Sequence, residues 1–265
     1  MVSKTFMLVQ KKEPFRAFKS KLRSMIIDVP RAVLYATGER LMIGLDLASG
    51  TTCSELKMAN SQPSELEIDP SSKRLFVATR EGLLLMFDIS QQGTPVLINM
   101  VKCVLQPGSV GTSYIKEMFF DHERRQLICR MSSGIIYFFA MVKNQAQILE
   151  LHEHYKATKN DKGLENVNKF CWISRLNCYC EGTKLGFLKI RVGDHGGECH
   201  LQFPMIFFDK IRLLHHDKTK NILFAASSDG QCFAWKLPPE WQAPWIEKKL
   251  INLRREANEW RFQKM

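Results

Sequence analysis

The amino-acid sequence predicts an all-β fold made of repeated strands, and three observations support that prediction. One pattern of polar turn, apolar strand, tight turn and apolar strand occurs five times, at 26–47, 66–89, 118–141, 170–192 and 213–237. The tight turns of successive repeats are separated by similar steps along the chain. No apolar run approaches the ~18–20 residues of a membrane-spanning helix, whereas the short runs that do occur suit buried strands.

The spacing of the repeats is typical of a β-propeller. Aligned on the tight turn, the steps between equivalent residues are 42, 52, 52 and 44, and these residues are Arg40, Gly82, Gly134, Gly186 and Gly230. A four-stranded propeller blade repeats at about 40–45 residues, and longer loops account for the excess. We therefore expect one propeller over residues 21–237, with about five visible four-stranded blades.

The turn residues favour antiparallel hairpins within each repeat. Asp69 and Asp217 begin turns between the first and second strands. Asp229-Gly230 lies between the second and third strands, where a two-residue hairpin needs positive φ. An apolar strand at 5–10 lies in the N-terminal segment, residues 1–20, and we expect it to complete the last blade. That pairing would remove an exposed sheet edge.

At these residues the chain resembles the WD40-repeat family. Blades of that family close on Trp-Asp, and the equivalents here are Phe87-Asp88 and Trp235-Lys236. The last repeat is similar to the propeller of the WD-repeat and FYVE-domain family, over 215–218, 227–230 and 243–245. The sequence has no counterpart of that family's zinc-binding FYVE module, so the resemblance does not imply lipid recognition.

The number of repeats departs from the WD40 pattern, because that family usually has seven blades. The ring is small, two blades have diverged, or the chain is incomplete. Residues 100–118 and 143–167 are too short to hide two full blades. We expect five visible blades, with an open or unusual closure as the main alternative to an ordinary ring.

The strand pattern stops after Leu237, and residues 238–265 predict a C-terminal amphipathic helix. Pro238-Pro239 ends the last strand, and apolar residues then recur at alternating steps of four and three. Such a helix docks on its own domain or on a partner, and both alternatives stay open. The residues expected to dock are Trp241, Trp245, Leu250, Leu253 and Trp260.

The net charge of +11 favours an anionic partner, such as an acidic protein face, RNA or an anionic membrane surface. A basic surface that only keeps the protein soluble is the alternative. The N-terminal 24 residues hold seven basic side chains and one acidic one, so the charge is uneven. The residues expected to bind the anionic partner are Lys11, Lys12, Arg16, Lys19 and Lys21.

Catalytic and metal-binding patterns are scarce. The sequence has no nucleophile elbow and no phosphate loop. Histidine and cysteine pairs, such as His152 with His154, do not make the four-ligand set of structural zinc. We therefore predict no enzyme, cofactor, metal site or small-molecule substrate.

The cysteines lie mostly in apolar strands and no secretory signal precedes them, which predicts a reducing, intracellular compartment. We expect the cytoplasm, and a mitochondrial presequence at the basic N-terminus is the alternative. The predicted function is a non-catalytic scaffold or adaptor that binds protein partners through propeller loops and the tail helix. The alternatives are an RNA-contacting subunit of a ribonucleoprotein particle and a membrane-surface adaptor.

Overall fold

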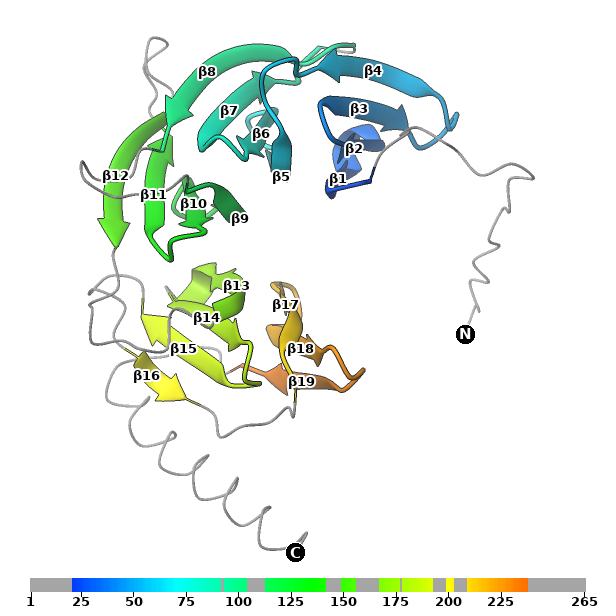
Figure 1. Ribbon diagram of the computed structural model, residues 1–265. Coiled ribbons are helices and arrows are strands. Elements are labelled where there is room, and N and C mark those ends of the chain that lie inside the picture. The colour runs from blue at the N-terminus through cyan, green and yellow to red at the C-terminus, as the bar shows by residue number, and fades with distance from the viewer. Residues whose placement is uncertain are drawn as a thin grey trace, which may run out of the picture.

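The computed structural model describes residues 21–91, 93–103, 113–141, 149–155, 167–176, 178–192, 199–202 and 209–237. These residues form five antiparallel sheets, which confirms the all-β prediction. The sheets follow one another along an arc, and the first strand of each sheet is innermost (Figure 1). In the described part of the chain, no helix is long and apolar enough to cross a membrane.

We number the sheets 1 to 5 in chain order. Sheet 1 contains β1 Ser24–Asp28, β2 Val33–Thr37, β3 Leu41–Asp46 and β4 Thr52–Lys57. Sheet 2 contains β5 Pro63–Asp69, β6 Arg74–Thr79, β7 Leu83–Asp88 and β8 Val96–Lys102. Sheet 3 contains β9 Ile115–Asp121, β10 Gln126–Met131, β11 Ile136–Met141 and β12 Leu149–Tyr155. Sheet 4 contains β13 Val167–Ile173, β14 Cys178–Thr183, β15 Leu188–Val192 and β16 Cys199–Gln202. Sheet 5 contains β17 Ile211–Asp217, β18 Ile222–Ser227 and β19 Cys232–Lys236.

An aspartate at the end of the first strand fixes the turn that follows it. The Oδ1 atoms of Asp69, Asp121 and Asp217 each accept a hydrogen bond from the backbone N–H two residues further on. These turns use a side-chain oxygen in place of a backbone acceptor, which explains the preference for aspartate. The turns predicted at Asp69 and Asp217 are therefore confirmed.

A β-bulge interrupts the first strand of four sheets near its start. The bulged residues, which have no partner in the strand register, are Ser64, Lys116, Asn168 and Arg212. A bulge re-aims its side chain, and two of these side chains reach the next sheet. Ser64 Oγ donates to the Ile115 carbonyl at 3.2 Å, and Asn168 Nδ2 donates to the Ile211 carbonyl at 2.6 Å.

Neighbouring sheets pack face to face through apolar side chains. Between sheets 2 and 3 the cluster includes Phe76, Met86, Leu127 and Phe139, and the rings of Phe76 and Phe120 stack at 5.6 Å. Similar clusters lie between sheets 1 and 2 and between sheets 4 and 5. These interfaces hold the described sheets in place along the arc.

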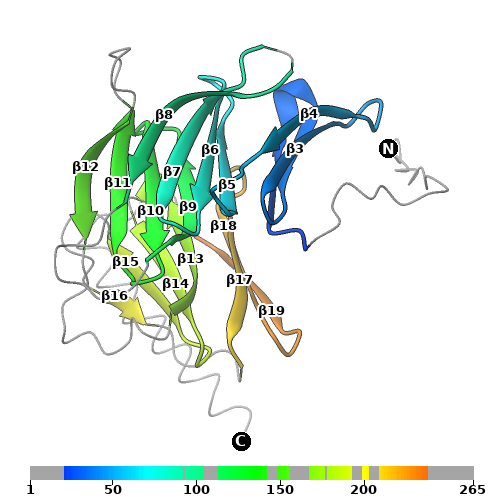
Figure 2. The same cartoon turned by 45° about the horizontal axis from the view of Figure 1, so that its top comes forward.

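The arc is not closed in the part of the chain that the structure describes. The inner strands contact one another in the order β1, β5, β9, β13 and β17, and no comparable contact joins β17 to β1. Sheets 1 and 5 are the two ends of the arc (Figures 1 and 2), and we call the side between them the open side. The strand expected at 5–10 and the helix expected at 238–265 lie outside the described residues. The number of blades in a complete ring stays a prediction.

Candidate functional site

The interface between sheets 3 and 4 holds charged side chains at positions that are apolar in the other sheets. These positions are paired residues of the second and third strands that face the preceding sheet. The apolar pairs are Val77 with Leu85, Cys129 with Tyr137, and Ala225 with Phe233. The corresponding pair in sheet 4 is Glu181 with Lys189, and Arg191 lies two residues further along β15.

Glu181 and Arg191 form a fully buried ion pair within sheet 4. Arg191 Nε donates to Glu181 Oε2 at 2.8 Å. Burial raises the pKa of the Glu181 carboxyl group, and the charge of Arg191 limits that rise. Because removing one partner would leave an uncompensated buried charge, this pair fixes the local arrangement of β14 and β15.

Glu117 and Arg130 form a second buried ion pair, on neighbouring strands of sheet 3. Arg130 donates to Glu117 Oε2 through Nε at 2.7 Å, and Nη2 lies 2.5 Å from the same oxygen. The other oxygen, Oε1, accepts the backbone N–H of Phe170 at 3.2 Å and lies 3.8 Å from Lys169 Nζ. Glu117 therefore joins sheet 3 to sheet 4 and fixes the Arg130 guanidinium.

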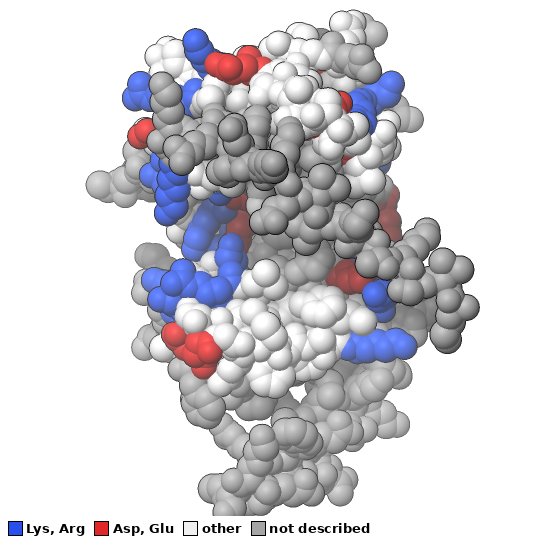
Figure 3. Space-filling model, turned by 90° about the vertical axis from the view of Figure 1, so that its right-hand side faces the viewer, with Lys and Arg blue, Asp and Glu red and all other residues white. Residues whose placement is uncertain are grey.

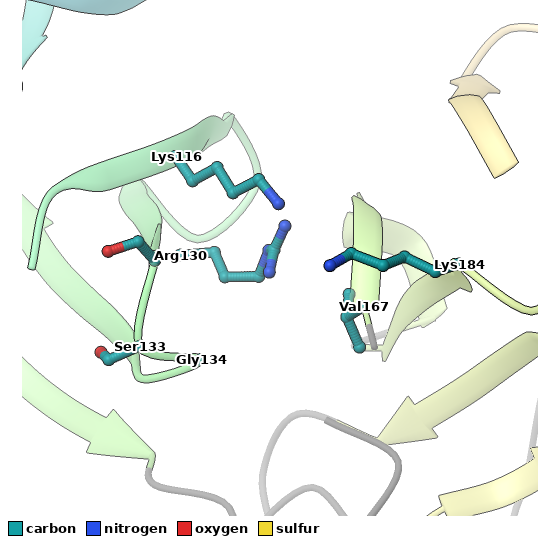
Figure 4. A pocket seen from close by; sticks show the side chains of 7 residues that line it. Lys116, Arg130, Ser133, Gly134, Val167 and Lys184 are labelled. Carbon is teal, nitrogen blue, oxygen red and sulfur yellow. The ribbon is translucent and has the colours of Figure 1, made fainter. Parts of the chain in front are cut away.

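A pocket of about 360 Å³ opens between sheets 3 and 4 at the end that carries the tight turns. We call it the tight-turn pocket, and it is lined by Lys116, Arg130, Ser132, Ser133, Gly134, Val167 and Lys184. Figure 4 shows the ends of Lys116 and Arg130 directed from sheet 3 toward the same space as the end of Lys184 from sheet 4. Burial and the charge of Arg130 lower the pKa of Lys116. The lining is therefore a cluster of like charges held close together.

A second pocket, of about 310 Å³, lies among the inner strands β5, β9, β13 and β17. Its charged side chains are of both signs, with Glu65, Glu67 and Glu117 facing the same hollow as Lys169 and Arg212. Burial raises the pKa of both Glu65 and Glu67 to about 7. This central pocket thus lacks the uniform positive charge of the tight-turn pocket.

The open side of the arc exposes apolar side chains on both end sheets. On β1, Met25 is 62% exposed and Ile27 is also exposed. On sheet 5, Leu213 of β17 is 49% exposed, and Phe224 of β18 is exposed on the same face. Figure 3 views the open side and shows Lys and Arg side chains together with Asp and Glu side chains around its hollow. The open side therefore combines apolar surface with charged side chains of both signs.

The residues predicted from the sequence as binding sites lie mostly outside the described residues. Lys21 is described and exposed, whereas Lys11, Lys12, Arg16 and Lys19 are not described. The tail residues Trp241, Trp245, Leu250, Leu253 and Trp260 are not described either. Within the described ranges, no three histidine, cysteine or acidic side chains come together as a metal site would require.

Sequence reasoning missed the residues of the tight-turn pocket, although the aligned repeats contain a sign of them. Four residues before the tight-turn glycine, sheets 2, 4 and 5 have Ala78, Gly182 and Ala226, and sheet 3 has Arg130. Arg130 is therefore a large cationic side chain at a position where sheets 2, 4 and 5 have Ala or Gly. This difference marks the interface between sheets 3 and 4. The direction of Lys116 depends on the bulge, which the sequence pattern does not indicate.

Comparison with known proteins identifies the fold. No family model matches the chain, and no curated protein matches it. The β-propeller domain of Cps50 (Swd1) from Myceliophteria thermophila is similar, with a TM-score of 0.63, 10% identity and coverage of 85% of this chain and 68% of that one. A chain of the mitotic checkpoint complex is similar with a TM-score of 0.58 and 12% identity, and the match covers 89% of this chain and 71% of that one.

Raptor from Chaetomium thermophilum is also similar, with a TM-score of 0.62 and 12% identity over 83% of this chain. The chain spans only 19% of the length of Raptor. The fold is a WD40-like β-propeller. Identities this low show the fold alone, and the narrower resemblance to WD-repeat and FYVE-domain proteins stays a prediction.

Proposed function

We propose that the protein is a non-catalytic interaction scaffold that binds a protein partner at the open side of its arc. The observation that carries this proposal is the exposed apolar face of each end sheet. Inside the arc, the positions equivalent to Met25 and Ile27 are Leu66 and Ile68, which are 4% and 6% exposed under the neighbouring sheet. Complete burial of one such side chain stabilises a complex by about 1.5–3 kcal/mol. A partner at the open side would supply the contacts that a neighbouring sheet supplies elsewhere.

The chemistry of the open side favours a partner with apolar and acidic side chains. Lys21, shortly before β1, is exposed, and Arg212, next to Leu213, is exposed and also lines the central pocket. Positive charge around an apolar contact steers an acidic partner and orients it. Among the similar structures is a chain of the mitotic checkpoint complex, an assembly of proteins, which is consistent with a scaffold. We also propose the cytoplasm as its compartment, because most of the cysteines lie in apolar strands, where they pack as small hydrophobic side chains.

The test is site-specific photo-crosslinking with matched positions. A photoreactive residue is placed at Met25 or Leu213 on the open side, and at Met100 or Leu97 on β8, which are 58% and 49% exposed. We expect the same nuclease-resistant protein to be crosslinked from positions 25 and 213 and not from 100 or 97. We expect Leu213→Glu to abolish its capture and Leu97→Glu to preserve it.

Equal crosslinking from all four positions would overturn the proposal. Crosslinks to RNA that disappear on nuclease treatment would instead favour the ribonucleoprotein subunit. Binding of the purified protein to vesicles that contain anionic lipid, lost at high salt, would favour the membrane-surface adaptor.

A further inference from the structure

We propose that the tight-turn pocket binds a phosphomonoester dianion through Lys116, Arg130 and Lys184. This site is separate from the open side, because it lies between two interior sheets. It therefore gives the scaffold a second, charge-specific binding function.

The charge of the pocket is the first argument. Among the described residues, three cationic side chains and no anionic side chain line it. The nearby carboxylate of Glu117 is already engaged by Arg130 and by the backbone of Phe170. Like charges held close together repel one another in a partly desolvated site. A dianion among them would replace that repulsion with charge-assisted hydrogen bonds.

A comparison of equivalent positions in the repeats provides the second argument. In the interfaces between sheets 2 and 3 and between sheets 4 and 5, residues at these positions contact the next sheet and leave no equivalent set of cations in the described part of the chain. At the bulge position, Ser64 and Asn168 form hydrogen bonds to the next sheet, whereas Lys116 is directed into the pocket. At the position of Arg130, sheet 4 has Gly182, and its backbone lies against the Ile211 side chain. Among the described residues, the interfaces between sheets 2 and 3 and between sheets 4 and 5 therefore lack the cationic side chains that line this pocket.

Preorganisation is the third argument. Arg130 is buried, and its interactions with Glu117 hold the guanidinium at the pocket wall. Fixed donors lose little conformational entropy when a ligand binds.

Phosphate fits this donor set better than a carboxylate does. Its oxygens point in several directions and accept bonds from cations on different strands, whereas a carboxylate has two oxygens in one plane. The pocket volume also leaves space for the group that carries the phosphate. The phosphomonoester can come from a phosphorylated side chain of a protein segment or from a free phosphorylated metabolite.

The test measures binding of three probes to the full chain by titration calorimetry. The probes are inorganic phosphate, glucose 6-phosphate, and a mixed-sequence phosphoserine peptide pool with its unphosphorylated counterpart. Binding of the phosphoserine pool at least tenfold tighter than glucose 6-phosphate identifies a protein segment as the source, and the reverse order identifies a metabolite. The unphosphorylated pool should not bind.

Lys184→Ala is the diagnostic variant, because Lys184 is exposed and its removal leaves both buried ion pairs intact. The matched control is Lys102→Ala, which removes the same charge from an exposed position on β8. We expect Lys184→Ala to weaken the best probe by tenfold or more and Lys102→Ala to change it less than twofold. Equal weakening by both variants, or no binding of any probe at 10 mM, would overturn the proposal.

The pH dependence provides a second readout that a folding defect does not reproduce. The second pKa of a phosphomonoester is about 6, so the dianion is lost below that pH. We expect the affinity of the parent for the best probe to fall between pH 7 and pH 5. As a folding control, the melting temperature of Lys184→Ala should match that of the parent. An affinity that is constant over this range would contradict recognition of a dianion.

Discussion

The interface between sheets 4 and 5 and the interface between sheets 3 and 4 use equivalent positions in opposite ways. Between sheets 4 and 5, Gly182 allows close approach, since a Cβ atom there would lie 2.6 Å from Ile211 Cγ2. Asn168 closes the inner side by its hydrogen bond to the Ile211 carbonyl. Between sheets 3 and 4, Arg130 and Lys116 occupy the equivalent positions and a pocket opens. The two interfaces therefore differ at two equivalent positions, the bulge residue and the residue four before the tight-turn glycine. Small or hydrogen-bonded residues there accompany close packing, and cationic residues accompany a pocket.

The opening between sheets 3 and 4 is confined to the end with the tight turns. At the other end, Trp172 Nε1 donates to Asp121 Oδ2 at 2.9 Å, and Arg124 Nη1 donates to the Ser174 carbonyl at 2.7 Å. Aromatic rings fill the middle, where Phe138 meets Trp172 edge to face at 5.6 Å. The interface is therefore held by hydrogen bonds at one end and contains the charged pocket at the other end.

The largest expected effect comes from breaking the pair that joins sheets 3 and 4. We expect Glu117→Gln to lower the free energy of unfolding by about 3–5 kcal/mol, because Arg130 would remain buried without its counter-ion. Denaturant unfolding followed by circular dichroism measures this loss. The control is the double variant Glu117→Gln/Arg130→Met, which should recover most of the stability. An unchanged midpoint for Glu117→Gln would mean that the pair does not hold this interface.

The next largest effect is expected at the end of this interface opposite the pocket, where Trp172 donates a hydrogen bond to Asp121. Trp172→Phe keeps the ring packing and removes the N–H that Asp121 accepts, so we expect a loss of about 1.5–3 kcal/mol. The pKa of the Asp121 carboxyl is held low by this hydrogen bond and by Arg124, against burial. Loss of this bond raises the Asp121 pKa in the folded state, so acid unfolding of Trp172→Phe should begin at a higher pH than that of the parent. A stability equal to the parent would show that the bond contributes nothing net.

A smaller effect is expected when a methyl group is added to the closely packed interface between sheets 4 and 5. Gly182→Ala places a methyl group against Ile211, and we expect a loss of about 1–3 kcal/mol from overpacking. In the background of Ile211→Ala the same substitution should cost less, because Cγ2 is gone. Thermal unfolding of the parent, the two single variants and the double variant gives this coupling. Strict additivity would contradict direct contact between the two positions.

The smallest expected effect is a pH dependence that arises in the central pocket. The pKa of Glu65 and of Glu67 is about 7 in the folded chain and near 4.3 in an unfolded one. Between these values the folded state binds more protons, so this contribution to stability is present below pH 4 and is lost as pH rises through 7. Glu65→Gln/Glu67→Gln should flatten the melting temperature between pH 5 and 8, and a steeper profile would contradict this origin.

Much of the fold was predictable from the repeats, because turns and strand alternation are local. Asp69, Asp217 and Asp229 mark hairpins by their own chemistry, and the five repeats correspond to the five described sheets. The open arc is a property of how sheets meet, and no single repeat encodes it. The predicted tail helix and the N-terminal basic cluster, apart from Lys21, lie outside the described residues, so they stay predictions.

The candidate site was less predictable, because it depends on contacts between repeats. The charges of Glu181, Lys189 and Arg191 are visible once the repeats are compared position by position. The pairing of Glu117 with Arg130 follows from strand register, and the direction of Lys116 follows from a bulge. A one-residue change of register would move each of these side chains to the other face.

The open arc also has a consequence for how the molecule unfolds. In a closed ring, separating two groups of blades requires two interfaces to break, whereas a linear stack divides when one fails. Among the described inner strands, β9 and β13 have the least contact with each other, so we expect such a stack to divide between sheets 3 and 4. Sheets 1 to 3 and sheets 4 and 5 would then be two cooperative units, distinguishable as two classes of protection in native-state hydrogen exchange.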